Sequence, residues 1–160
     1  MPTSVEKYDA ARRSVWNYPP MLYVTQTVSQ NLNTSTSTLI NFDTVVYDNY
    51  NGFSIAGSTY TVAVAGWYWL NTYVNYNANN TGVRIARALQ NGVGGGILVS
   101  AMPTNTVGSL TITAMVSGPV QCAVGDTLVI HGFQSSGGVL GTHVGGGFFS
   151  SFMLEWLRLP

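Results

Sequence analysis

Charged side chains are scarce in this sequence. Its 160 residues include six Lys and Arg and six Asp and Glu, so charged residues make up 8% of the chain and the formal net charge at pH 7 is zero. An ordinary globular protein carries about 25%. Because a neutral chain lacks the basic surface that binds phosphates, we expect no nucleic-acid partner. The weak charge also gives little repulsion between copies, which favours a chain that works inside an assembly.

Cysteine and long apolar runs are also in short supply. The single cysteine, Cys122, excludes an internal disulfide and is expected to be a small buried apolar side chain. The first residues, MPTSVEKYDAARR, lack the apolar region of a signal peptide, and no apolar stretch reaches the length of a membrane helix. We therefore expect neither a classical secretion signal nor membrane insertion.

Residues that could carry catalysis or bind a metal do not form a known motif. The two histidines, His131 and His143, are far apart in sequence, and with one cysteine they make no metal-ligand cluster by spacing. The glycine-rich run at 92–96 lacks the Gly-Lys-Ser/Thr that completes a phosphate loop. We expect no catalytic, cofactor-binding or metal-binding residues, and hence a protein that is not an enzyme.

The six acidic residues are scattered along the chain. Asp126 follows a glycine, and an aspartate at such a place typically bonds to the backbone of a turn. Asp43 and Asp48 have two interpretations. They either satisfy turn backbone, which we favour, or join a cation site with Asn49 and backbone oxygens.

Residues 1–19 differ in composition from the rest of the chain and form a candidate docking arm. Thr3 and Glu6 have the spacing of a capping box, which predicts a short helix over residues 4–15 that ends before Pro19 and Pro20. Such a helix is too short to persist alone in water, so we expect it to dock on a partner. The alternative is a disordered tail. The residues expected to anchor the arm are Tyr8, Arg12, Arg13, Val15, Trp16 and Tyr18.

Residues 20–160 have a β pattern throughout and form the second predicted unit. Short apolar runs alternate with Gly, Asn and Pro turns, which indicates an all-β sandwich. The predicted strands include 21–29, 83–89, 97–102, 109–116, 120–124, 127–133 and 148–159. A long aromatic strand places Trp67, Trp69, Asn71, Tyr73 and Asn75 on one face, and Tyr68, Leu70, Thr72, Val74 and Tyr76 on the other. Since both faces carry aromatics, we expect one face in the core and the other against a second copy.

Several motifs of this region resemble one known family. They are INFDTVVYDN at 40–49, an aromatic-glycine series through Phe53, Gly57, Tyr60, Gly66 and Tyr68, RIARALQNG at 84–92, VQCAVGDTLVI at 120–130 and FSSFML at 149–154. In this order they resemble the globular head of complement's q subcomponent and the wider tumour-necrosis-factor (TNF) superfamily. The sequence departs from the family pattern at Ala65, where proline is usual, and at Ser151, where glycine is usual.

The resemblance implies a TNF-like jelly roll of about ten strands that forms a tight homotrimer and has no enzyme activity. The family's trimer axis corresponds here to Trp69, Asn71, Tyr73 and Phe149. The arm lies outside the family pattern, and no collagen-like Gly-x-y stalk is present. By analogy, a trimeric jelly roll with an arm resembles an accessory virion protein of a tailed phage.

The sequence therefore favours a phage virion protein, either a minor tail protein or a capsid decoration protein, that is assembled in the host cytoplasm. Its expected partners are its own copies, other virion proteins through residues 1–19, and in one version a glycan or protein of the host surface. The alternative is a free extracellular carbohydrate- or protein-binding module of the complement-head type.

Overall fold

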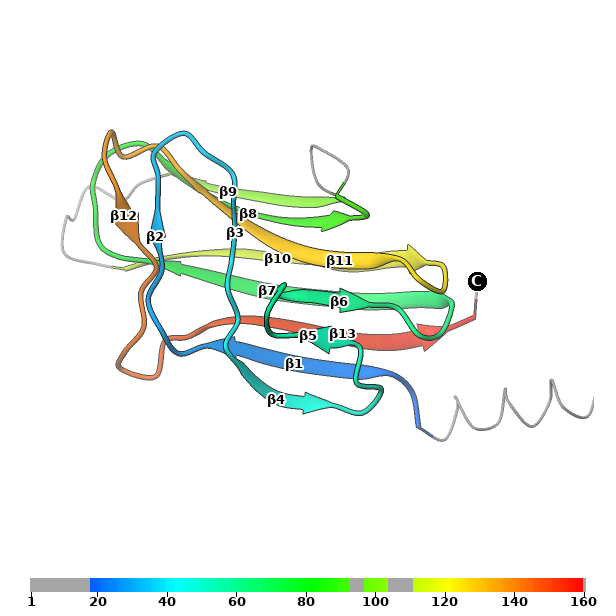
Figure 1. Ribbon diagram of the computed structural model, residues 1–160. Helices are drawn as coiled ribbons and strands as arrows, with labels where there is room; N and C mark the ends of the chain where they lie inside the picture. Colours follow the sequence, from blue (N-terminus) through cyan, green and yellow to red (C-terminus); the bar gives the residue numbers. More distant parts are fainter. Residues whose placement is uncertain (1–17, 93–96, 104–110, 160) are drawn as a thin grey trace, which may run out of the picture.

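The chain folds as two antiparallel β-sheets that pack face to face. The computed structural model describes residues 18–92, 97–103 and 111–159 (Figure 1). We name each sheet after its central strand. The β7 sheet has the order β10 (Ile112–Cys122), β7 (Gly66–Tyr76), β13 (Ser150–Arg158), β1 (Met21–Gln26) and β4 (Thr44–Asp48). The β11 sheet has the order β5 (Phe53–Ser54), β6 (Thr59–Thr61), β11 (Thr127–Gln134), β8 (Val83–Gln90) and β9 (Leu98–Pro103).

Three short strands complete the described fold. Strand β3 (Thr38–Leu39) pairs with β11, and β2 (Asn31–Leu32) pairs with β12 (Leu140–Gly141). Neighbours within each sheet are often distant in sequence, such as β1 and β13. Such pairs form because the chain crosses repeatedly from one sheet to the other, and this topology confirms the predicted all-β jelly-roll sandwich. The described part of the chain contains no helix with the length and apolarity that a membrane crossing requires.

The core fills the space between the sheets and follows the predicted alternation of β7. Tyr68, Leu70 and Tyr76 are fully buried, whereas Trp69 on the opposite face is exposed. The two buried tyrosines keep their hydroxyl groups bonded, since Tyr68 donates to the carbonyl of Val64 and Tyr76 to that of Ile85, each at 2.6 Å. Burial raises the pKa of both phenols. The core face of β7 is therefore the even-numbered one.

One buried side chain was not expected in the core. Arg84 is fully buried, and its guanidinium donates to the carbonyls of Thr81 and Val83 at 3.0 Å and of Asn79 at 3.3 Å. No carboxylate of the described residues pairs with it, and its Nε has no partner there. Arg84 thus ties the loop before β8 to the end of the sandwich through backbone carbonyls.

The described strand boundaries differ from the predictions by more than one residue at three places, each for a local reason. The first strand ends at Gln26 instead of residue 29 because the carboxylate of Asp43 takes the N–H groups of Thr27 and Val28. The predicted strands 109–116 and 120–124 form one strand, β10, which continues through Pro119. That proline is tolerated because β10 is an edge strand, which needs no ladder bond on its outer side. The last strand begins at Ser150 instead of residue 148 because Phe148 closes a turn.

Both ends of the described chain leave the sandwich at the same end. Strand β1 starts beside the finish of β13, and the N–H of Trp156 donates to the carbonyl of Pro20 at 2.9 Å (Figure 1). The hairpin between β12 and β13 lies at the opposite end of the sandwich. The predicted helix at 4–15 and five of the anchoring residues, Tyr8, Arg12, Arg13, Val15 and Trp16, lie outside the described residues.

Candidate functional site

The outward face of the β7 sheet carries a continuous apolar surface. The pairing of β1, β13 and β7 sets Met21, Glu155 and Trp69 in one row across the sheet. The next row contains Tyr23, Met153 and Asn71. Large apolar side chains exposed on this face include Met21 and Tyr23 of β1, Tyr47 of β4, Trp69 of β7 and Met115 of β10. A soluble monomer rarely exposes so broad an apolar patch, so this face is a candidate interaction surface.

A groove of about 400 Å³ lies in the middle of this face. Trp69 stands on its wall with 45% of its surface exposed, and Glu155 is the one ionisable acid in the lining. The complete lining is Met21, Leu22, Tyr23, Tyr47, Trp69, Asn71, Met153, Leu154 and Glu155. A partner that fills the groove must therefore offer mainly apolar side chains.

Asn71 brings an unsatisfied polar group to the same face. Its Nδ2 donates to the hydroxyl of Tyr73 at a long 3.4 Å, and its Oδ1 is buried without a partner among the described residues. Buried side-chain acceptors are nearly always bonded in folded proteins. Asn71 is therefore a weakly bonded polar group within an otherwise mainly apolar face.

Tyr73 and Phe149 meet at the other end of the face. They line a hollow of about 300 Å³ together with Asn75, Thr113 and Phe148. Asn75 is nearly buried there, and its Oδ1 is satisfied by a hydrogen bond from the hydroxyl of Thr113. The two phenylalanines belong to a tight hairpin in which the N–H of Phe148 donates to the carbonyl of Gly145 at 2.9 Å.

Glycine is required in that hairpin. The backbone φ angles of Gly146 and Gly147 are 58° and 84°, in the left-handed region that side chains disfavour. This conformation fixes the turn and leaves both phenylalanines exposed beside β7.

The structure places all four residues predicted at the trimer axis on this one face. Trp69 and Asn71 share the groove, and Tyr73 and Phe149 share the hollow. Sequence reasoning missed the contribution of the neighbouring strands, which is Met21, Tyr23, Tyr47, Met115 and Met153. The alternation of the first strand predicts that Met21 and Tyr23 share one face. It does not predict that this face points outward, because that depends on the pairing with β13.

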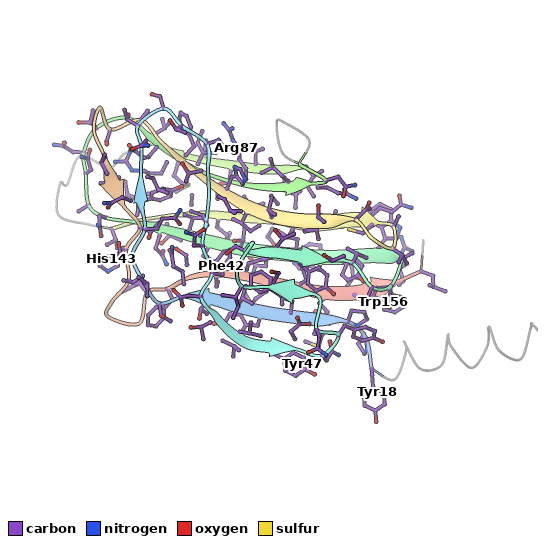
Figure 2. The ribbon with its side chains drawn as sticks, viewed as in Figure 1. Tyr18, Phe42, Tyr47, Arg87, His143 and Trp156 are labelled. Atoms are coloured by element: carbon purple, nitrogen blue, oxygen red, sulfur yellow. The ribbon has the colours of Figure 1, made fainter. Side chains whose placement is uncertain are left out.

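Tyr18 is the one predicted anchoring residue of the arm that lies among the described residues, and it is 73% exposed and points away from the body (Figure 2). The turn after β4 holds the backbone beside it. Asn49 donates from Nδ2 to the carbonyl of Pro19 at 2.8 Å and accepts from the N–H of Met21 at 2.8 Å. The hydroxyl of Tyr50 donates to the carbonyl of Tyr18 at 3.1 Å. These bonds fix the direction in which the chain enters the sandwich.

Asp43 and Asp48 accept hydrogen bonds from the backbone of turns. Asp43 accepts from the N–H groups of Thr27 and Val28, and Asp48 accepts from those of Tyr50 and Phe53. These contacts support the turn interpretation. In the described ranges, no three His, Cys, Asp or Glu side chains gather as metal ligands would.

The prediction that Asp126 bonds to the backbone of a turn is confirmed, because it accepts a hydrogen bond from the N–H of Ala123. It also accepts hydrogen bonds from the side chains of Gln90 and Asn91. Cys122 is buried as expected, and burial together with the nearby Asp126 raises the pKa of its thiol to about 11. The thiol therefore stays protonated at neutral pH, which is the state of a structural cysteine and not of a nucleophile.

The two histidines make structural hydrogen bonds in separate places. Nδ1 of His131 lies 3.2 Å from the hydroxyl of Ser37, and Nδ1 of His143 lies 3.1 Å from Oδ1 of Asn77. His131 is on β11 and His143 follows β12. Neither lies in the groove or the hollow of the β7 sheet.

Three solved structures with the same architecture come from a fish, a mouse and an insect. The globular domain of zebrafish complement 1qA protein aligns with 88% of this chain and 99% of its own, with a TM-score of 0.65 and 13% identity. Murine APRIL, in a crystal at pH 5.0, aligns over 86% of this chain and 98% of its own, with a TM-score of 0.65 and 11% identity. The Eiger TNF of S. frugiperda gives a TM-score of 0.60 at 12% identity, over 88% and 92%.

The chain has the TNF-like jelly-roll fold. This confirms the fold that the sequence motifs implied. At such low identities the likeness concerns the fold alone, so function must be argued from the faces of this molecule. No family model and no curated protein matches the sequence.

Proposed function

We propose that this protein is a non-enzymatic structural component of a bacteriophage particle, a homotrimer of jelly rolls held to the particle by arms of residues 1–19. In this proposal it serves as a minor tail protein or a capsid decoration protein and is assembled in the host cytoplasm. The observation that carries self-association is the apolar outward face of the β7 sheet, on which Trp69, Asn71, Tyr73 and Phe149 lie together.

The composition of that face favours a second copy of the chain as its partner. Its apolar side chains would be removed from water on contact, at about 25 cal/mol per Å² of apolar area. The family resemblance of the sequence implies the same face and a threefold arrangement. Trp69, Asn71, Tyr73 and Phe149 are the proposed interface residues.

The geometry of the chain entry supports the arm as an anchor. Pro19 and Pro20 lead into β1, and Asn49 and Tyr50 hold this segment by hydrogen bonds, so the arm starts from a fixed point. Three copies around one axis would send three arms from the same end of the trimer. Such arms bind with avidity even where each is weak. The hairpin at the opposite end would then point away from the particle, which is where contact with a host glycan or protein would occur.

The experiment is to compare particles made with the full chain and with a chain that begins at Tyr18. This shortened chain keeps the bonds to Asn49 and Tyr50 and loses only the residues before them. We expect it to remain a folded trimer and to be missing from purified particles imaged by electron microscopy. Normal incorporation of the shortened chain, or absence of the full chain from every particle, would contradict the proposal.

A second candidate function is a free extracellular module that binds a carbohydrate or a protein. The groove of about 400 Å³ on the outward face of the β7 sheet favours it, because its mainly apolar lining could hold a segment of a partner molecule. A free module needs no arm, so deletion of residues 1–17 would leave its binding to a glycan or protein unchanged. A virion component loses its place in the particle on the same deletion.

A further inference from the structure

The outward face of the β11 sheet is a second surface with an unusual composition. Along β8 and β11 the side chains alternate between core and solvent, and the pairing sets Arg87 beside His131 and Ile85 beside Phe133. Val99 of the edge strand β9 pairs with Arg87 from the other side and is 51% exposed. We call Ile85, Arg87, Val99, His131 and Phe133 the Arg87 patch. It is apolar except for one cation and one imidazole.

Arg87 has no counter-ion in the described protein. Its guanidinium carbon lies over the ring of Phe133, 5.5 Å from the ring centre, and this contact helps to position the side chain. Its Nε is buried and has no hydrogen-bond partner among the described residues. Figure 2 shows Arg87 on the β8 side of the sandwich, far from the edge that carries Tyr47. The patch therefore presents a guanidinium that Phe133 positions and that no carboxylate of the described residues neutralises.

His131 adds a polar contact without adding a second charge. Its Nδ1 lies 3.2 Å from the hydroxyl of Ser37. Burial, and secondly the charge of Arg87, lower the pKa of this imidazole, so it is neutral at pH 7. No carboxylate contributes to that shift. The patch accordingly carries a single positive charge, which matches a monoanion.

The acids of this chain do not supply that monoanion. Asp43 accepts hydrogen bonds from the backbone after β1, and Asp48 and Asp126 accept them within their own turns. Glu155 lies in the groove of the other sheet. The remaining two acids of the sequence are Glu6 and Asp9 of the arm, and they stand among three cations within the first thirteen residues.

We propose that the Arg87 patch is a docking surface for a partner protein that presents one carboxylate side chain among apolar side chains. The planar guanidinium offers a carboxylate two parallel N–H groups, and the stacking on Phe133 orders it beforehand. Val99 and Ile85 give apolar contact around the ion pair, which lowers the local dielectric and strengthens it. The inference concerns the face opposite to the one proposed for self-association and does not depend on it.

A protein fits this surface better than a nucleic acid or a glycan. A nucleic acid presents many phosphates, and one cation cannot match them. A sugar ring would need a free aromatic face, but the guanidinium of Arg87 covers the ring of Phe133. The exposed aliphatic side chain of Val99 packs best against other apolar side chains, and a partner protein can supply them.

The test uses the full chain labelled with ¹⁵N at arginine and two capped peptides, acetyl-Leu-Glu-Val-amide and acetyl-Leu-Gln-Val-amide. We expect the glutamate peptide to shift the Nε–Hε signal of Arg87 in a saturable way, and the glutamine peptide to bind at least about tenfold more weakly because it lacks the charge-assisted bond. The Arg87→Gln variant has no such signal, so it and the unmodified chain are also labelled uniformly with ¹⁵N and compared at the backbone amides of Val99 and His131, which pair with position 87. The variant is expected to lose the binding. The Arg158→Gln variant, which removes an exposed cation outside the patch, is expected to retain it.

Several outcomes would overturn the proposal. These are the absence of a saturable shift, equal binding of both peptides, or binding that survives in Arg87→Gln. Sedimentation of the Arg87→Gln variant separates this proposal from the preceding one, because we expect its oligomeric state to be that of the unmodified chain. If the variant dissociates, the patch contacts a second copy and the docking proposal is wrong.

Discussion

The replacement of Trp69 by alanine is the most direct perturbation of the proposed interface. An aromatic side chain of this size buries up to about 250 Å², and 45% of Trp69 is still exposed in the protomer, so about 110 Å² remains to be covered by another copy. At about 25 cal/mol per Å² this area contributes about 3 kcal/mol per protomer. A symmetric trimer contains the site three times, so Trp69→Ala should weaken assembly by about 8 kcal/mol in total.

A loss of that size moves the trimer from stable to dissociated at micromolar concentration, since every 1.4 kcal/mol is a factor of ten. Sedimentation velocity is the assay, with Tyr73→Asp as a second variant that would bury an unpaired charge at the interface. Ile55→Ala is the matched control, because Ile55 is 52% exposed in the turn between β5 and β6. If Trp69→Ala and Tyr73→Asp sediment like the control, the outward face of β7 is not the interface.

Other regions of the molecule give four further predictions. Arg84→Met should lower the free energy of unfolding by about 3 kcal/mol in denaturant titrations, because it removes three part-buried hydrogen bonds from a charged donor, whereas Arg158→Met should change it little. Asp43 has a lowered pKa: burial raises it, but hydrogen bonds from Thr27 and its neighbours outweigh burial. Its stabilising effect is therefore present above its ordinary pKa of about 4 and is lost as the pH falls below that, and Asp43→Asn should flatten this acid dependence of the unfolding free energy. Tyr50→Ala should leave the oligomeric state unchanged, and a dissociated variant would place Tyr50 in the interface. Residues 20–160 should show no salt-sensitive retention on duplex DNA.

The sequence predicted which strands are present better than it predicted where each strand begins and ends. The alternation through β7 identified both of its faces, because a strand with aromatics on each side has little freedom in how it packs. The ends of strands depended on distant partners that no local pattern contains. Asp43, for example, ends β1 by bonding to Thr27 and Val28, which are fifteen or more residues away.

The candidate site was predictable only in part. Trp69, Asn71 and Tyr73 follow from one strand, whereas Tyr23, Tyr47 and Met115 join them through strand pairing. The sequence also gave no reason to place Arg84 inside the core and Arg87 outside it, because both stand in the same alternating strand and only the packing of the sheet sets its inner face. The anchoring arm stays a prediction, apart from the exposed Tyr18 and the segment that Asn49 holds.

Sedimentation equilibrium of the unmodified chain at micromolar concentration tests the central claim most directly. The account predicts a single species with three times the 17.1 kDa mass of one chain. It also predicts that this mass persists at high salt, because the proposed interface is apolar and includes only Glu155 as a charged group in its groove. A stable monomer under these conditions would contradict the account.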